Sequence, residues 1–139
     1  MGNILIVEDD DSFGYILKEY LEIHDFTVNW VQDGELGLKA FQQNVYDLCI
    51  LDVMMPLKDG FTLAKEIQDH DPDVPFIFLS AKSLKIDRLK GFRLGCDDYV
   101  VKPIDEELFI ARVKAIVKRV GTEGESTKKG TTFKIGEYT

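Results

Sequence analysis

The chain has 139 residues, of which 45% are hydrophobic and 30% are charged, a composition typical of a soluble globular domain. Its length suits one domain with its own core and a short additional segment. The formal net charge of −8 at pH 7 argues against a nucleic-acid-binding surface, because a phosphate backbone is bound by clustered Lys and Arg side chains. No apolar stretch approaches the roughly 20 residues that span a bilayer, so we expect no membrane association.

The two cysteines, Cys49 and Cys96, do not form a CxxC pair. We therefore expect both to be free thiols in a reducing compartment. No signal peptide precedes the first predicted strand. Together these features predict a cytoplasmic protein.

Hydrophobic periodicity predicts five strands that alternate with five helices. The strands are predicted at Asn3–Val7, Phe26–Val31, Asp47–Leu51, Phe76–Leu79 and Tyr99–Val101. The first helix is expected to be capped by Asp11 or Ser12, and its apolar face consists of Phe13, Ile16, Leu17, Tyr20 and Leu21. The later helices are predicted at Gly34–Gln43, Asp59–His70, Ser83–Arg93 and Asp105–Val120.

Two of the later helices have a recognisable apolar face. The helix Gly34–Gln43 is expected to bury Leu36, Ala40 and Phe41. The last helix is expected to bury Phe109, Val113, Ile116, Val117 and Val120. Strands that alternate with helices predict an α/β fold, with a parallel sheet covered on both faces. Right-handed crossovers would then bring the ends of strands one, three, four and five to the same edge.

The composition changes at Gly121, where the apolar periodicity ends. Residues 121–130 are polar and are predicted to form a linker, so the first domain comprises residues 1–120. Residues 131–139 resume a strand-like alternation around Phe133, Ile135 and Tyr138. Nine residues cannot fold alone, so we interpret this segment as the first strand of a second domain that the chain does not include.

Polar residues directly follow four of the predicted strands. Asp52 comes between a buried strand and a Pro/Gly turn. The segment Glu8-Asp9-Asp10 follows the first strand, Ser80 follows the fourth, and Lys102-Pro103 follows the fifth. A parallel sheet would gather all of them at the edge where α/β folds hold their ligands. This grouping indicates metal-assisted phosphorylation of Asp52.

The carboxylates of Glu8, Asp9 and Asp52 would repel one another unless a cation or protons neutralise them. Magnesium prefers oxygen ligands, and the backbone carbonyl of Met54 could complete such a set. The alternative is that these acids only favour a helix N-terminus, which is the better interpretation for Asp10 and for Asp11.

Two further side chains could neutralise a phosphoryl group on Asp52. Lys102 could act as a point charge, and the hydroxyl of Ser80 could hydrogen-bond a phosphoryl oxygen. Taken singly, Ser80 could equally be a turn residue and Lys102 a solvated side chain. The bond before Pro103 can adopt the cis form and direct the preceding side chain inward. All the alternative interpretations would have to hold at once, so the conjunction favours the phosphorylation site.

From Asn3 to about Val120 the chain resembles the receiver domain of bacterial two-component response regulators. The resemblance rests on Glu8-Asp9, the LDVMMPxxDG segment around Asp52, Ser80-Ala81, and Gly95–Pro103. It implies a flavodoxin-like, doubly wound five-stranded parallel sheet of order 2-1-3-4-5 with five helices. It also implies that Asp52 takes a phosphoryl group from a sensor histidine kinase. The domain would promote only its own phosphorylation and dephosphorylation and would not be an enzyme that turns over a free substrate.

The same resemblance implies roles for individual residues. Mg²⁺ would be held by Glu8, Asp9, Asp52 and the Met54 carbonyl. Ser80 would move toward the phosphoryl group and Tyr99 would rotate inward behind it. The alternative for Tyr99 is an ordinary amphipathic tyrosine at a strand edge.

The tail Phe133–Thr139 resembles the opening strand of the winged-helix domain in OmpR/PhoB-type transcription factors. This implies that promoter DNA is bound only through the missing C-terminal domain. Receivers of that class form homodimers through helix four, strand five and helix five, where Arg88, Asp98 and Arg112 match charged positions. Phosphorylation would favour this dimer and so control transcription.

Three other functions share some of these features. A phosphatase of the haloacid dehalogenase type would need a second Asp two positions after the nucleophile, where the chain has Met54. A dinucleotide-binding domain would need a G-x-G-x-x-G motif after the first strand, and none is present. A receiver-like binding module that is not phosphorylated remains the alternative.

Overall fold

The computed structural model describes the backbone of residues 2–82 and 84–126, and the side chains of these residues up to 119. The chain divides into two units, Met1–Ile104 and Asp105–Thr139, which are considered in turn. The predicted strand at residues 131–139 and the end of the predicted linker lie outside the described residues.

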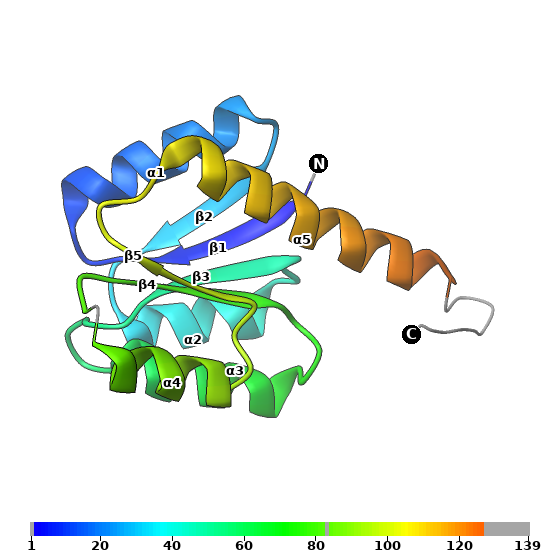
Figure 1. Ribbon diagram of the computed structural model, residues 1–139. Coiled ribbons are helices and arrows are strands. Elements are labelled where there is room, and N and C mark those ends of the chain that lie inside the picture. The colour runs from blue at the N-terminus through cyan, green and yellow to red at the C-terminus, as the bar shows by residue number, and fades with distance from the viewer. Residues whose placement is uncertain (1, 83, 127–139) are drawn as a thin grey trace. The chain divides into compact units, whose positions relative to one another are not determined.

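The first unit contains a five-stranded parallel sheet (Figure 1). Its strands are β1 (Asn3–Val7), β2 (Thr27–Val31), β3 (Leu48–Asp52), β4 (Phe76–Ser80) and β5 (Asp98–Val101). Their order is β2-β1-β3-β4-β5, which confirms the predicted order. Each strand lies within one residue of its prediction, although Asp52 and Ser80 are the last residues of their strands rather than the first residues after them.

The three central strands form the core of this unit. All residues of β3 and β4 are buried, as are Ile4–Val7 of β1. A parallel sheet that is covered on both faces has continuous apolar strands, which is the pattern seen here. The register pairs Val7 with Leu51 and Asp52 with Leu79, so the carboxyl ends of the strands are nearly level.

Four helices cover this sheet, with α1 (Asp11–Ile23) on one face and the other three on the opposite face (Figure 1). The other three are α2 (Gly34–Gln43), α3 (Gly60–His70) and α4 (Lys85–Arg93). The side chain of Asp10 caps α1 by accepting from the N–H of Phe13, so the predicted cap at Asp11 or Ser12 is wrong. The extended backbone of Asp10 places its carboxylate within reach of that N–H.

The buried helix faces agree in part with the prediction. Leu17 and Leu21 of α1, and Ala40 and Phe41 of α2, are buried as expected. Two predicted core residues are exposed: Ile16 to 56% and Leu36 to 47%. Helix α2 approaches β1 at Gly37, where an added Cβ would lie 2.9 Å from Val7 Cγ2. The side of α2 that carries Gly37 therefore faces β1, and Leu36 lies at the edge of this buried side.

The second unit contains α5 (Glu106–Ser126). Asp105 precedes it, and its Oδ1 accepts from the N–H of Leu108 at 3.2 Å. The predicted buried residues Phe109, Val113, Ile116 and Val117 are indeed buried, whereas the side chain of Val120 lies outside the description.

The predicted end of this helix at Val120 is wrong because α5 continues to Ser126. No proline follows Val120, and extending an existing helix requires only one residue to be ordered per added hydrogen bond. Among the described residues, no helix is both long enough and apolar enough to cross a membrane.

Candidate functional site

The fold buries polar side chains at the carboxyl ends of its strands. Among the residues that the structure describes, the buried polar or charged side chains are Glu8, Asp52 and Ser80. They lie just after β1 and at the ends of β3 and β4. Burying such groups is unfavourable unless they are paired, so their concentration in one place marks a site.

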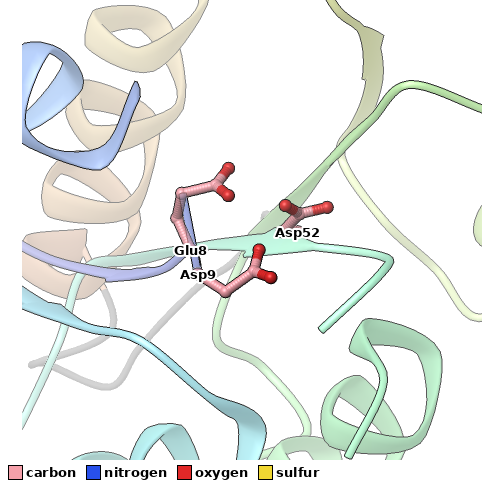
Figure 2. A group of neighbouring side chains, drawn as sticks. All are labelled: Glu8, Asp9 and Asp52. Carbon is pink, nitrogen blue, oxygen red and sulfur yellow. The ribbon is translucent and has the colours of Figure 1, made fainter. Parts of the chain in front are cut away.

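Three carboxylates form a cluster at this edge. Glu8, Asp9 and Asp52 each offer an oxygen atom, and these atoms lie within 4.8 Å of one another. Figure 2 shows the three carboxylates around one small region. Asp10 instead caps α1, and Asp11 lies in its first turn and pairs with Gln32. The helix-terminus interpretation therefore applies to Asp10 and Asp11 but not to Glu8.

Lys102 enters the cluster from the segment after β5. Its Nζ lies 2.8 Å from Glu8 Oε1 and 3.2 Å from Asp52 Oδ2. Burial alone would lower the pKa of Lys102, but the hydrogen bond with Glu8 and the charge of Asp52 outweigh burial and raise this pKa. The peptide bond between Lys102 and Pro103 is cis, as the X-Pro sequence allows.

One ammonium does not balance three carboxylates. Burial, together with the neighbouring Asp52, raises the pKa of Glu8, although Lys102 and the N–H of Asp10 oppose this change. Burial and the neighbouring Glu8 likewise raise the pKa of Asp9. The site therefore favours the uptake of positive charge, and its carboxylate oxygens are the donors that Mg²⁺ prefers.

The main chain around Asp52 fixes its carboxylate. The N–H of Met54 donates to Asp52 Oδ1 at 3.1 Å. The N–H of Gly60, the first residue of α3, donates to the Val53 carbonyl at 2.9 Å. A Cβ at Gly60 would lie 2.3 Å from the Asp52 carbonyl oxygen, so only glycine allows α3 to begin this close to β3.

A cleft of about 560 Å³ adjoins the carboxylates. Its lining includes Asp9, Met54, Phe61, Lys82 and Lys90. The Nζ of Lys90 lies 4.8 Å from the centre of the Phe61 ring. The cleft therefore meets the carboxylate cluster at Asp9, and its lining carries two lysines together with Asp59 and Asp87.

Ser80 and Tyr99 both hold the main chain of Lys82. The N–H of Lys82 donates to Ser80 Oγ at 2.8 Å, and the Tyr99 hydroxyl donates to the Lys82 carbonyl at 3.1 Å. Tyr99 is only 8% exposed, so its side chain is buried, and its rotation on phosphorylation stays a prediction. Its ring packs against α4 at Gly91, where an added Cβ would lie 2.8 Å from Tyr99 Cδ2.

Two aromatic residues at the site were not expected from the sequence. The ring of Phe13, predicted only as a core residue, lies under Lys102, with Nζ 4.6 Å from the ring centre. The indole Nε1 of Trp30 donates to the Glu8 carbonyl at 2.9 Å. No spacing in the sequence signals either contact, because each joins segments that are distant along the chain.

The predicted dimer residues lie on three elements. Arg88 is exposed on α4, Asp98 is partly buried on β5, and Arg112 is exposed on α5. Because α5 belongs to the second unit, the three residues are described one by one and not as a single surface. The dimer face remains a prediction.

Comparison with known proteins identifies the family. The sequence model described as the response regulator receiver domain matches residues 4–114. The chain is 48% identical over 136 residues to the transcriptional regulatory protein RprY of Bacteroides fragilis, covering 98% of this chain and 57% of that protein. The chain thus spans little more than half the length of the curated relatives it matches.

Solved structures agree with this match. The receiver domain of Francisella response regulator 1452 has a TM-score of 0.82 and 30% identity, covering 86% of this chain and 98% of that one. The BeF3-activated N-terminal receiver domain of Klebsiella pneumoniae RstA has a TM-score of 0.79 and 27% identity, covering 84% and 98% respectively. The order of the strands, the residues gathered at their ends and these likenesses lead to one conclusion: the chain belongs to the response regulator receiver family.

Proposed function

We propose that this domain is a phosphorylation-dependent switch in which Asp52 accepts a phosphoryl group from the phosphohistidine of a sensor histidine kinase. The observation that carries the proposal is the position of Asp52. Its side chain is almost completely buried at the end of β3, next to two further carboxylates and hydrogen-bonded to Lys102. Membership of the receiver family supports the same function.

The reaction exchanges one bond to phosphorus for another. A carboxylate oxygen of Asp52 forms a bond to phosphorus as the phosphorus–nitrogen bond of phosphohistidine breaks, and the leaving imidazole takes a proton. Asp52 is a nucleophile once ionised, so the site must mainly position it and neutralise charge on the phosphoryl oxygens. Lys102 Nζ, already 3.2 Å from Asp52 Oδ2, is placed to pair with one of those oxygens.

Glu8, Asp9, Asp52 and the Met54 carbonyl would hold Mg²⁺. When bound, this cation supplies the remaining neutralisation of phosphoryl charge. The carboxylate oxygens within 4.8 Å of one another support this assignment, as do the raised pKa values of Glu8 and Asp9. The N–H of Met54 keeps the Asp52 carboxylate oriented for the reaction.

The main chain of Lys82 connects Ser80 to Tyr99 and so offers a path for the switch. If Ser80 Oγ turns to a phosphoryl oxygen, the N–H of Lys82 loses the hydrogen bond that it now makes at 2.8 Å. The Lys82 peptide is then free to shift, and with it the carbonyl that anchors the Tyr99 hydroxyl. Adding about −2 of charge beside such a two-state element is enough to bias it.

The output is a symmetric homodimer that controls transcription. Arg88, Asp98 and Arg112 would form cross-subunit ion pairs. Promoter DNA would be bound through a C-terminal domain of the OmpR/PhoB type that begins with residues 131–139. The similarity to a transcriptional regulatory protein supports this part. Residues 1–120 would form the cytoplasmic receiver. Residues 121–130, which begin with the end of α5, would join it to that domain. Sedimentation that found only monomer after phosphorylation, even at high concentration, would contradict the dimer.

Intact-mass spectrometry after incubation with acetyl phosphate tests the phosphorylation step. We expect a single phosphoryl adduct that requires Mg²⁺. The adduct should be absent from Asp52→Asn and present in Asp69→Asn, which removes an exposed carboxylate of α3 instead. Absence of the adduct despite measurable Mg²⁺ binding would favour a receiver-like binding module.

A further inference from the structure

Trp30 reaches from the edge strand β2 to the turn between β1 and α1. Its indole is partly buried, and Nε1 donates to the backbone carbonyl of Glu8 at 2.9 Å. Helix α1 makes room for this ring because it has no side chain at Gly14. A Cβ added there would lie 2.3, 2.4 and 2.6 Å from three atoms of the indole.

The hydrogen bond acts on the peptide that joins the two acidic residues of the turn. The N–H of Glu8 is held by the Val31 carbonyl at 3.0 Å, and Glu8 Oε2 accepts from the N–H of Asp10 at 3.0 Å. The indole holds the carbonyl of the same residue. Because a peptide group is planar, fixing the Glu8 carbonyl also fixes the direction in which the chain enters Asp9.

We propose that Trp30 is a positioning residue of the divalent-cation site, acting through the Glu8 carbonyl on the carboxylates of Glu8 and Asp9. The inference rests on the proposed function, because it assumes that these carboxylates bind a divalent cation. Partners outside the ligand shell hold ligands in the binding geometry, and their loss weakens metal affinity. A tryptophan that only filled space beside Gly14 would stabilise the fold without affecting that affinity.

The chain contains a single tryptophan, so an analogue incorporated in place of tryptophan changes only position 30. In β-(3-benzothienyl)alanine a sulfur atom replaces the indole N–H, so the ring keeps its approximate size but loses the donor. We expect the substituted chain to melt close to the unsubstituted chain but to bind Mn²⁺ about three- to tenfold more weakly by calorimetry.

Two results of the Mn²⁺ measurement would contradict the proposal, and they have different meanings. Equal Mn²⁺ affinity of the two chains would overturn the role of Trp30 and leave the proposed function intact. If the unsubstituted chain binds no Mn²⁺, both this inference and the proposed cation site are overturned.

A double-mutant cycle provides a second, independent test. Gly14→Ala should weaken Mn²⁺ binding because its Cβ would displace the indole, although alanine by itself favours a helix. In a Trp30→Ala background the same substitution should have no further effect, because the ring it displaces is gone. Equal weakening by Gly14→Ala in both backgrounds would overturn the proposal.

The single indole N–H signal gives a readout that does not depend on activity. In a ¹H–¹⁵N spectrum, we expect this signal to exchange slowly with solvent. It should also shift during a Mg²⁺ titration, with the Kd that calorimetry gives for Mg²⁺. A signal that exchanges rapidly and does not respond to Mg²⁺ would contradict the hydrogen bond and its role.

Discussion

The two sides of the site differ in how firmly the fold holds them. On the β1 side, the main chain of Glu8 is bonded at both its N–H and its carbonyl, and Asp10 caps the helix that follows. On the β4 side, the N-cap residue of α4 is Leu84, which makes no side-chain cap hydrogen bond. Helices α1, α2 and α3 are each preceded by a capping aspartate.

Helix α4 also buries less than its neighbours. Gly91 is its one buried residue, whereas α3 buries five residues. Around it, four large apolar side chains are exposed to 43% or more: Leu84, Ile86, Leu89 and Phe92. With little apolar area buried and no cap, α4 has few interactions that oppose local opening.

This difference matches the two tasks that we propose for the site. A cation site requires carboxylates that are already in place, whereas a switch requires an element that can change position at a low cost in free energy. The β1 side holds its carboxylates in place, and the α4 side contains a helix that can change position at a low cost in free energy. The following predictions test this division, beginning with the largest expected effect.

Mg²⁺ should stabilise the domain more at pH 8 than at pH 5. The raised pKa of Glu8 means that the folded chain binds this proton more tightly than the unfolded chain. The resulting stability is present at low pH and is lost as the pH rises through the folded-state pKa. Mg²⁺ binds the deprotonated carboxylates, so protons compete with it more strongly at pH 5 than at pH 8.

Urea unfolding measures this effect. A Mg²⁺ concentration of 100 times the Kd at pH 8 should add about 2.7 kcal/mol at that pH and clearly less at pH 5. NaCl of equal ionic strength is the control for screening. Equal stabilisation by Mg²⁺ at both pH values would show that these carboxylates do not titrate with cation binding.

Gly91→Ala should displace Tyr99 from its inward position. The added Cβ would lie 2.8 Å from Tyr99 Cδ2 and 3.1 Å from Phe78 Cδ2. Phe78 is completely buried and has no space to move, so Tyr99 must give way. The gain of about 1 kcal/mol in helix propensity opposes an overpacking cost of about 1–3 kcal/mol, so the free energy of unfolding should change by less than about 2 kcal/mol.

Fluorine NMR of the 3-fluorotyrosine-labelled chain reports the position of Tyr99, whose signal is identified by its loss in Tyr99→Phe. We expect a changed Tyr99 signal in Gly91→Ala. Gly37→Ala is the matched control, because its Cβ would contact Val7 and Leu63 instead. Gly37→Ala should lower the free energy of unfolding without altering the Tyr99 signal. An unchanged Tyr99 signal in Gly91→Ala would contradict the packing of the Tyr99 ring on Gly91.

Leu84→Asp should give α4 the cap that the other helices have. Residue 84 already has the extended backbone of a cap (φ −66°, ψ 144°), and its side chain is 67% exposed, so little packing is lost. A new cap contributes about 1 kcal/mol. Hydrogen exchange should therefore slow in α4, while Mn²⁺ affinity stays the same. Faster exchange of the α4 amides would mean that Leu84 supports the helix in another way.

Much of the candidate site could be predicted because each of its residues stands at or next to the end of a strand. Glu8, Asp9, Asp52, Ser80 and Lys102 each lie at or just after the end of an apolar run, and a parallel sheet aligns those ends. The local sequence pattern did not identify the correct helix cap where several capping residues are adjacent. Asp10 rather than Asp11 caps α1, since the choice depends on one residue's backbone angles.

By itself, the sequence determined the order of the elements and the strand-end cluster around Asp52, because these follow from short-range hydrophobic periodicity and the rules of parallel sheets. The family was indicated separately, by the resemblance of the motifs at these strand ends. Only the tertiary structure decided that Trp30 holds the Glu8 carbonyl, that Phe13 lies under Lys102 and that Tyr99 packs inward against Gly91. These contacts join residues that are distant along the chain. They depend on the local fit of one helix against one strand, which periodicity does not specify.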